Sequence, residues 1–183
     1  MITLMRSRQL PVLIILGLAG FPGLLGCRSA QPLGEADFGD ANRQAVEVVL
    51  DDFHLAASQA DGERYFGHMT EDMVFLGTDA TERWTKQRFQ LYVQEHFSRG
   101  QGWTYRPLDR HVFLGPGPDT AWFDERLMNE KYGECRGTGA LRRIDGVWYV
   151  AQYNLTLPVP NDVAPEVLRL IREHAVEAAA RRR

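Results

Sequence analysis

The sequence has little cysteine, 2 residues among 183, and no excess of positive charge. With so few thiols, packing of side chains rather than a framework of disulfides has to hold the fold. The formal net charge of −3 excludes the basic surface that nucleic-acid binding needs, so no nucleic-acid partner is expected. Hydrophobic residues make up 44% and charged residues 25%, a balance typical of a globular domain rather than a disordered chain.

Several motifs of known chemistry are also missing. The chain has no phosphate-binding glycine loop, no Gly-x-Ser-x-Gly nucleophile turn and no dinucleotide fingerprint. Its histidines do not show the His-x-x-x-His or His-x-x-His spacing of a helical metal site; they are His54, His68, His96, His111 and His174. We therefore expect no metal and no cofactor.

The first segment has the features of an export signal. Arg6 and Arg8 give it a positive start, and residues 10–20 form an apolar run too short to span a bilayer comfortably. Residues 24–27, Leu-Leu-Gly-Cys, resemble the cleavage site of bacterial lipoproteins, in which the cysteine becomes the lipidated first residue of the mature chain. That resemblance implies a signal peptide over residues 1–26 and fatty acids, palmitate included, on Cys27. An ordinary secretory signal or an uncleaved anchor is the alternative interpretation.

The same resemblance predicts where in the cell the protein is located. Several fatty-acid chains on Cys27 would attach the protein to a membrane stably, because two such signals already suffice. Arg28 rather than aspartate follows the cysteine, which resembles lipoproteins sorted to the outer membrane, so we expect a cell-envelope protein on the periplasmic face of that membrane. Residues 27–39 are then the lipidated cysteine and a short tether. Cys135 is left without a partner and is interpreted as a small apolar filler, with a catalytic thiol beside Arg136 as the alternative.

Helices are predicted where apolar residues recur at helical spacing after a capping side chain. There are four such stretches: Asp40 to about residue 60, a short helix after Asp61, Thr85 to about Gly100, and about Pro165 to Ala180.

Strands are predicted in most of the chain between the third and fourth helices, where β-branched and aromatic residues cluster. The expected strands are 73–76, 103–107, 111–114, 120–128, 135–144 and 147–157. Asp145-Gly146 predicts a tight hairpin between the last two. The last strand is rich in apolar residues on both faces, so we expect it at the centre of the sheet, buried on both sides and covered by helices.

Helices that precede strands indicate an α+β domain with the helices on one face of a curved antiparallel or mixed sheet. This order resembles the cone-shaped fold of SnoaL-like polyketide cyclases, ketosteroid isomerase and the nuclear transport factor two family. The resemblance is carried by residues 75–79, Phe-Leu-Gly-Thr-Asp, by residues 121–125, Ala-Trp-Phe-Asp-Glu, and by the last strand, where Trp148 is followed by a pair of prolines. It implies a SnoaL-like domain over residues 40–162, a conical pocket between the concave sheet face and the helices, and a C-terminal helical extension over residues 163–183.

Asp124 is the candidate catalytic residue. Alternation along residues 120–128 places it on one strand face with Trp122 and Met128, and apolar surroundings raise the pKa of a carboxyl group by desolvation. Such a group can act as a general base or a neutral acid. The alternative is a structural ion pair with Arg126 or Arg136 across the sheet.

The candidate ligand-binding residues are aromatic side chains and amides: Tyr65, Trp84, Trp122, Gln152 and Asn154. Many SnoaL-like proteins have histidine at two alternating positions of the last strand, where this chain has Gln152 and Asn154. These amides can orient a ligand or tie helix ends to the sheet. Tyr65, Trp84 and Tyr153 can line the pocket mouth, but aromatic side chains in this fold more often belong to the core, so both places stay open.

Three functions follow as hypotheses. The first is a lipid-anchored envelope protein whose pocket binds a small, partly apolar or amphipathic molecule or a partner protein. The second is an isomerase, cyclase or dehydratase that transfers a proton through Asp124, with Gln152 and Asn154 as donors. The third is a structural homodimer formed through the outer sheet face.

Overall fold

The computed structural model describes residues 35–181, and the predicted signal peptide, Cys27 and most of the tether lie outside them. The described residues form an α+β domain, as predicted. Its helices are α1 (Glu35–Ser58), α2 (Gly62–Gly67), α3 (Lys86–Phe97) and α4 (Ala164–Arg181). Its strands are β1 (Met69–Leu76), β2 (Arg83–Thr85), β3 (Arg106–Leu114), β4 (Thr120–Asn129), β5 (Gly133–Ile144) and β6 (Val147–Thr156).

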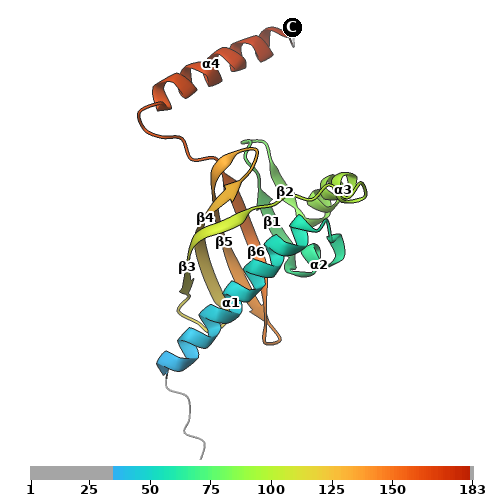
Figure 1. The fold of residues 1–183 in the computed structure, drawn as a ribbon, viewed down its shortest axis with the longest axis vertical. Helices are drawn as coiled ribbons and strands as arrows, with labels where there is room; N and C mark the ends of the chain where they lie inside the picture. The colour runs from blue at the N-terminus through green and yellow to red at the C-terminus, as the bar shows by residue number, and fades with distance from the viewer. Residues whose placement is uncertain (1–34, 182–183) are drawn as a thin grey trace, which may run out of the picture. The chain divides into compact units, whose positions relative to one another are not determined.

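The six strands form one sheet in the order β2-β1-β6-β5-β4-β3, so β6 has a neighbour on both sides, as expected of a central strand (Figure 1). Neighbouring strands are antiparallel except β1 and β6, which run parallel. The predicted hairpin between β5 and β6 turns at Asp145 and Gly146, both with positive φ angles (50° and 84°). Two such residues in a row are typical of the type I′ turn that joins twisted antiparallel strands.

The helices α1, α2 and α3 pack on one face of the sheet, and α1 contacts both β3 and β6 as it crosses that face (Figure 1). The core lies between this face and the helices; its largest fully buried apolar side chains include Phe53, Tyr65, Phe89, Phe123 and Leu127. Among residues 35–181, none of these three helices covers the opposite sheet face. Strand β4 shows the difference directly, because its residues alternate between exposed and buried along Thr120–Leu127.

The composition of β6 suggested that both of its faces are buried. In the structure only one face is buried. Trp148, Val150, Tyr153 and Leu155 are buried, and the residues between them are half-buried or exposed. The uncovered face of β6 also carries aromatic and β-branched residues, because these residues favour strands in general. Its composition therefore resembles that of a strand covered on both sides.

Helix starts agree with the predicted caps more closely than strand limits do. The Asp61 side chain accepts a hydrogen bond from the backbone N–H of Arg64 at 3.1 Å and begins α2, and Thr85 plays the same part for α3. Helix α1 begins at Glu35, earlier than the predicted start at Asp40. In place of the two strands predicted over 103–107 and 111–114, the structure has one strand, β3. Strand β3 lies at the edge of the sheet, where a proline such as Pro107 is tolerated.

Helix α4 corresponds to the predicted C-terminal extension, and none of its residues is buried. Within residues 35–181, no helix is both long enough and apolar enough to cross a membrane.

Candidate functional site

The helix-covered face of the sheet holds a pocket of about 480 Å³. Its wall is made by α1, β1, α3, β6 and the segments around residues 77–84, 102–105 and 129–132. Aromatic side chains dominate the lining: Trp84, Tyr92, Trp103, Tyr105, Tyr132 and Tyr153. Tyr92 and Tyr132 are nearly half exposed and stand at the open end, while His54 and Tyr153 are buried and form the inner end.

One side of the pocket is a set of nearly parallel rings centred on Phe75. Its ring is stacked with Phe89 at a centroid distance of 4.0 Å and 15°, and with Tyr153 at 5.7 Å and 11°. Trp84 continues the set toward the open end at 6.1 Å and 17°. Rings stacked in this way cover much of one another's faces and form a continuous apolar wall, which suits a partly apolar ligand.

The open end of the pocket also carries charge. Glu82, Glu130 and Lys131 line it, and the Lys131 Nζ lies 4.8 Å from the centre of the Tyr132 ring. Asp79 stabilises the turn at the rim, because its Oδ1 accepts a hydrogen bond from the Thr81 N–H at 2.7 Å. The polar rim can orient a ligand that enters rings first.

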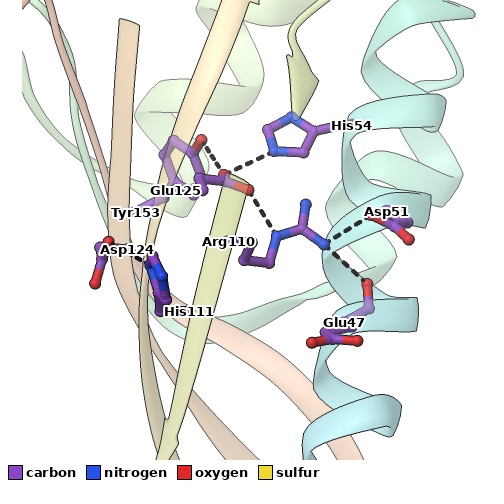
Figure 2. A network of polar contacts seen from close by, with 8 residues as sticks. All are labelled: Glu47, Asp51, His54, Arg110, His111, Asp124, Glu125 and Tyr153. Carbon is purple, nitrogen blue, oxygen red and sulfur yellow. Dashed lines mark hydrogen bonds and ion pairs between the residues drawn. The ribbon is translucent and has the colours of Figure 1, made fainter. Parts of the chain in front are cut away.

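The inner end of the pocket contains a buried network around Glu125 (Figure 2). The Glu125 side chain is fully buried, and one oxygen, Oε1, contacts the His54 Nε2 at 2.8 Å and accepts a hydrogen bond from the Tyr153 hydroxyl at 2.8 Å. The other oxygen, Oε2, accepts from the Arg110 Nε at 2.8 Å. Arg110 also donates from Nη1 to Asp51 at 2.7 Å, so it links β3 and β4 to helix α1.

These contacts determine the protonation of Glu125. Burial raises the pKa of a carboxyl group, but the hydrogen bond and charge of His54 and the charge of Arg110 outweigh it, and the pKa of Glu125 lies below its usual value. Burial and the Glu125 charge together raise the pKa of the Tyr153 phenol well above its usual range. Glu125 is therefore an ionised acceptor and Tyr153 a neutral donor.

The ionised carboxylate also determines the tautomer of His54. A carboxylate can only accept, so the Nε2 that contacts it has to carry the hydrogen. The other nitrogen, Nδ1, accepts a hydrogen bond when the ring is neutral and donates one when the ring is protonated. Among residues 35–181, none makes a hydrogen bond with that Nδ1, and His54 lines the pocket. The arrangement presents an oriented ring nitrogen at the inner end of an aromatic pocket.

Gly137 makes room for this network. It lies opposite Glu125 in the neighbouring strand β5, and a Cβ there would lie 2.4 Å from the Tyr153 hydroxyl and 2.7 Å from the Glu125 Oε1. A glycine inside a strand often marks such a close approach. The Gly-Thr-Gly run at residues 137–139 is the sequence signal that could have pointed to Glu125 and Tyr153.

Asp124, the predicted catalytic residue, lies on the sheet face away from the pocket. Its side chain is 52% exposed and faces His111, with 3.2 Å between Oδ1 and the His111 Nδ1 (Figure 2). Trp122 lies on the same outer face, nearly half exposed, and is stacked with Phe113. Asp124 and Trp122 therefore do not line this pocket, because alternation separates the two faces of a strand but does not identify the covered one. The catalytic role of Asp124 and the ligand-binding role of Trp122 stay predictions.

Gln152 and Asn154 do not line the pocket either. Unbroken alternation would place them on the same face as Trp148 and Val150, but the pairing of β5 with β6 shifts by one residue at Ala151. Such a bulge exchanges the two faces of the strand beyond it. As a result Tyr153 and Leu155 face the pocket.

Tyr65, Trp84 and Tyr153 do line the pocket, and a ligand-binding role for them stays a prediction. Cys135 is fully buried, and burial raises the pKa of its thiol. Both findings agree with the interpretation of Cys135 as an apolar filler. In the part of the chain that the structure describes, no group of three or more His, Cys, Asp or Glu side chains is placed to hold a metal ion.

Comparison with known proteins is consistent with this fold. Residues 46–160 match the family model described as SnoaL-like domain. No curated protein sequence matches the chain.

Solved structures with the same fold come from several bacteria. An NTF2-like protein of unknown function from Pseudomonas putida is 14% identical with a TM-score of 0.56, covering 68% of this chain and 92% of its own. A protein of unknown function from Mycobacterium tuberculosis is 21% identical with a TM-score of 0.54, covering 81% and 94%. A candidate scytalone dehydratase from Novosphingobium aromaticivorans is 12% identical with a TM-score of 0.58, covering 68% and 89%. At these identities the likeness shows the fold alone.

Proposed function

Because the chain belongs to the SnoaL-like domain family, we propose that its pocket binds a small, partly apolar molecule whose polar group meets His54. The observation that carries this proposal is the oriented, unshared Nδ1 of His54 at the inner end of a wall of parallel rings. A volume of about 480 Å³ lies within the usual range for pockets that bind small molecules.

The chemistry of the lining defines the ligand further. The rings of Phe75, Trp84 and Tyr153 favour an apolar body. The His54 Nδ1 accepts a hydrogen bond when the ring is neutral and donates one when it is protonated, so the buried end of the ligand carries a polar group. Glu82, Glu130 and Lys131 at the open end tolerate a second polar group that keeps contact with water.

Native mass spectrometry of the full chain purified from its host membrane tests this proposal by detecting a co-purified small molecule. Trp84→Ala removes a ring from the pocket wall, and Trp122→Ala is the matched control because Trp122 lies on the outer face. We expect the Trp84 variant to lose the bound molecule and the Trp122 variant to keep it. Equal occupancy in both variants would contradict a ligand site in this pocket.

A second candidate function is proton transfer on the bound molecule, with His54 as the base and Glu125 as the residue that positions it. The His54–Glu125 contact of 2.8 Å and the free Nδ1 favour it over the Asp124 mechanism. The reaction class is an isomerisation or an elimination. Once the ligand is identified, His54→Gln should abolish its turnover and Asp124→Asn should leave turnover intact; turnover by the His54 variant would exclude this function.

The cellular location of the protein is a separate part of the proposal. We propose that Cys27 is lipidated and attaches the domain to the periplasmic face of the outer membrane. Metabolic labelling with a palmitate analogue, followed by separation of inner and outer membranes, tests both statements. Cys27→Ser should lose the label, and a wild-type chain without label would contradict lipidation.

A homodimer is a further proposal, and the stacked pair Phe113 and Trp122 on the outer sheet face supports it. Both side chains are nearly half exposed, 44% and 48%. An apolar pair of this size is typical of a contact surface when it lies at the centre of a patch. Light scattering of the full chain in detergent should show two copies, and Trp122→Arg should show one.

A further inference from the structure

Helix α4 has an apolar stripe that nothing in the described chain covers. None of the 18 residues of α4 is buried, and Leu168 and Ile171 are 50% and 58% exposed. At about 100° per residue, the apolar side chains of one face fall within an arc of about 100°. They are Val167, Leu168, Ile171, Ala175 and Ala178, defined here as the α4 stripe.

The charges of α4 are ordered around this stripe. Arg172 follows Leu168 at one edge of the stripe, while His174 and Arg181 lie beside Val167 at the other edge, all within about 40° of a stripe residue. The carboxylates take the far side of the helix. They are Glu166, Glu173 and Glu177, each within about 50° of the direction opposite the stripe centre. Arg169 lies among them and pairs with Glu166 at 2.9 Å and with Glu173 at 2.6 Å, so the far side keeps more negative than positive charge.

This order of signs suits an anionic lipid surface. When a helix lies flat at a membrane, its apolar face enters the acyl boundary and its edges lie at the level of the phosphates. An arginine at an edge can bury the aliphatic part of its side chain and reach a phosphate with its guanidinium group. Acidic side chains on the far side stay in water, away from the negative headgroups. A helix packed on protein needs the stripe but has no requirement for cations at both edges and anions opposite.

The geometry points to α4 as a membrane-surface helix: we propose that the α4 stripe binds the surface of an anionic bilayer, with Arg172 and Arg181 at the phosphates. Its 18 residues span about 27 Å when helical, and they lie along the surface rather than across it. This contact is separate from the ligand pocket and from the proposed lipid on Cys27. It would hold the C-terminal end of the domain at the membrane.

The test is hydrogen–deuterium exchange of the full chain loaded at one copy per lipid nanodisc, read from peptides within residues 164–181. The double variant Leu168→Gln/Ile171→Gln replaces two apolar side chains of the α4 stripe with polar ones. Leu170→Gln/Val176→Gln is the matched control, because these two residues are similarly exposed, 52% and 71%, but lie off the stripe. The discs contain a zwitterionic lipid alone or the same lipid with an added anionic lipid.

We expect the α4 peptides of the wild-type chain to exchange about tenfold more slowly on anionic discs than those of the stripe variant. The control variant should stay within about twofold of the wild type, and added salt should weaken the protection. Equal exchange in both variants would overturn the proposal, as would a wild-type chain that does not associate with discs. Protection that appears only with two or more copies per disc would also overturn it, in favour of pairing between α4 helices.

Discussion

Asp124 and Glu125 are consecutive in β4, yet their carboxylates lie on opposite faces of the sheet. The Asp124 side chain is 52% exposed and faces His111, while the Glu125 side chain is fully buried and contacts His54, Arg110 and Tyr153. The two residues therefore form a natural pair for experiments, because similar substitutions at adjacent positions should have very different effects.

Replacing Glu125 should destabilise the domain far more than replacing Asp124. Glu125→Gln removes one partner of the buried pair with Arg110, and breaking a buried pair in this way costs about 3–5 kcal/mol. Asp124→Asn changes an exposed contact and should stay within about 0.5 kcal/mol. Urea denaturation of the two variants and the wild type measures both differences. A loss of the same size in both variants would show that the Glu125 network does not stabilise the fold.

The tautomer of His54 can be read directly. Because the ionised Glu125 can only accept, neutral His54 should carry its hydrogen on Nε2 and leave Nδ1 bare. Nitrogen-15 NMR correlation spectra of the imidazole rings distinguish the two tautomers. His174 on α4 is exposed and serves as the reference for a solvent-exposed ring. A neutral His54 ring with its hydrogen on Nδ1 and a bare Nε2 would contradict the network.

A methyl group at position 137 should disturb the network without changing any charge. The added Cβ of Gly137→Ala would lie closer to the Tyr153 hydroxyl and the Glu125 Oε1 than real atoms approach, so one of them has to move. Overpacking of this kind costs about 1–3 kcal/mol. Gly67→Ala is the control, because nothing lies within 4 Å of a Cβ there. Thermal unfolding of both variants should show a clear loss only for position 137.

The ion pair between α1 and α2 should make stability depend on pH in the acid range. The Asp52 carboxylate accepts hydrogen bonds from Arg64 at 2.8 Å and lies 2.6 Å from the His68 Nε2. The Arg64 hydrogen bond, helped by His68 and opposed by burial, lowers the pKa of Asp52 from 3.8 to about 2.

The sign of this effect follows from the lowered pKa. The unfolded chain binds the proton more tightly, so the contribution of Asp52 is complete well above pH 4 and is lost as the pH falls toward 2. We expect Asp52→Asn to cost about 1 kcal/mol at pH 7 after allowance for solvent screening. The difference between wild type and variant in urea denaturation should shrink from pH 5 to pH 3. A difference that does not change over this range would exclude the ion pair as its source.

Local chemistry made much of the fold predictable. The hairpin at Asp145-Gly146 needs two positive φ angles, and the helix starts at Asp61 and Thr85 need a side-chain acceptor, so each is determined by a few neighbouring residues. The central place of β6 was also predictable, because few other segments have so many β-forming residues.

The candidate site was less predictable, because it depends on which strand face is covered. Alternation in β4 separates Asp124 from Glu125, but only the packing of α1 decides which of them is buried. In β6 the bulge at Ala151 exchanges the faces midway, so Tyr153 rather than Gln152 enters the pocket. Arg110 joins β3 to α1 across 59 positions of sequence, a separation that no local pattern reports.

The parallel pairing of β1 with β6 has a consequence for how the protein is made. Strand β1 has only the three-residue strand β2 on its other side, so its main partner, from Val150 to Asn154, is synthesised long after it. Met73 and Phe75 therefore lack their final neighbours until nearly the whole domain is available to fold, whether at the ribosome or after export. We expect the half-made sheet to bind chaperones during that interval, and truncation before residue 147 should produce a chain that proteases remove.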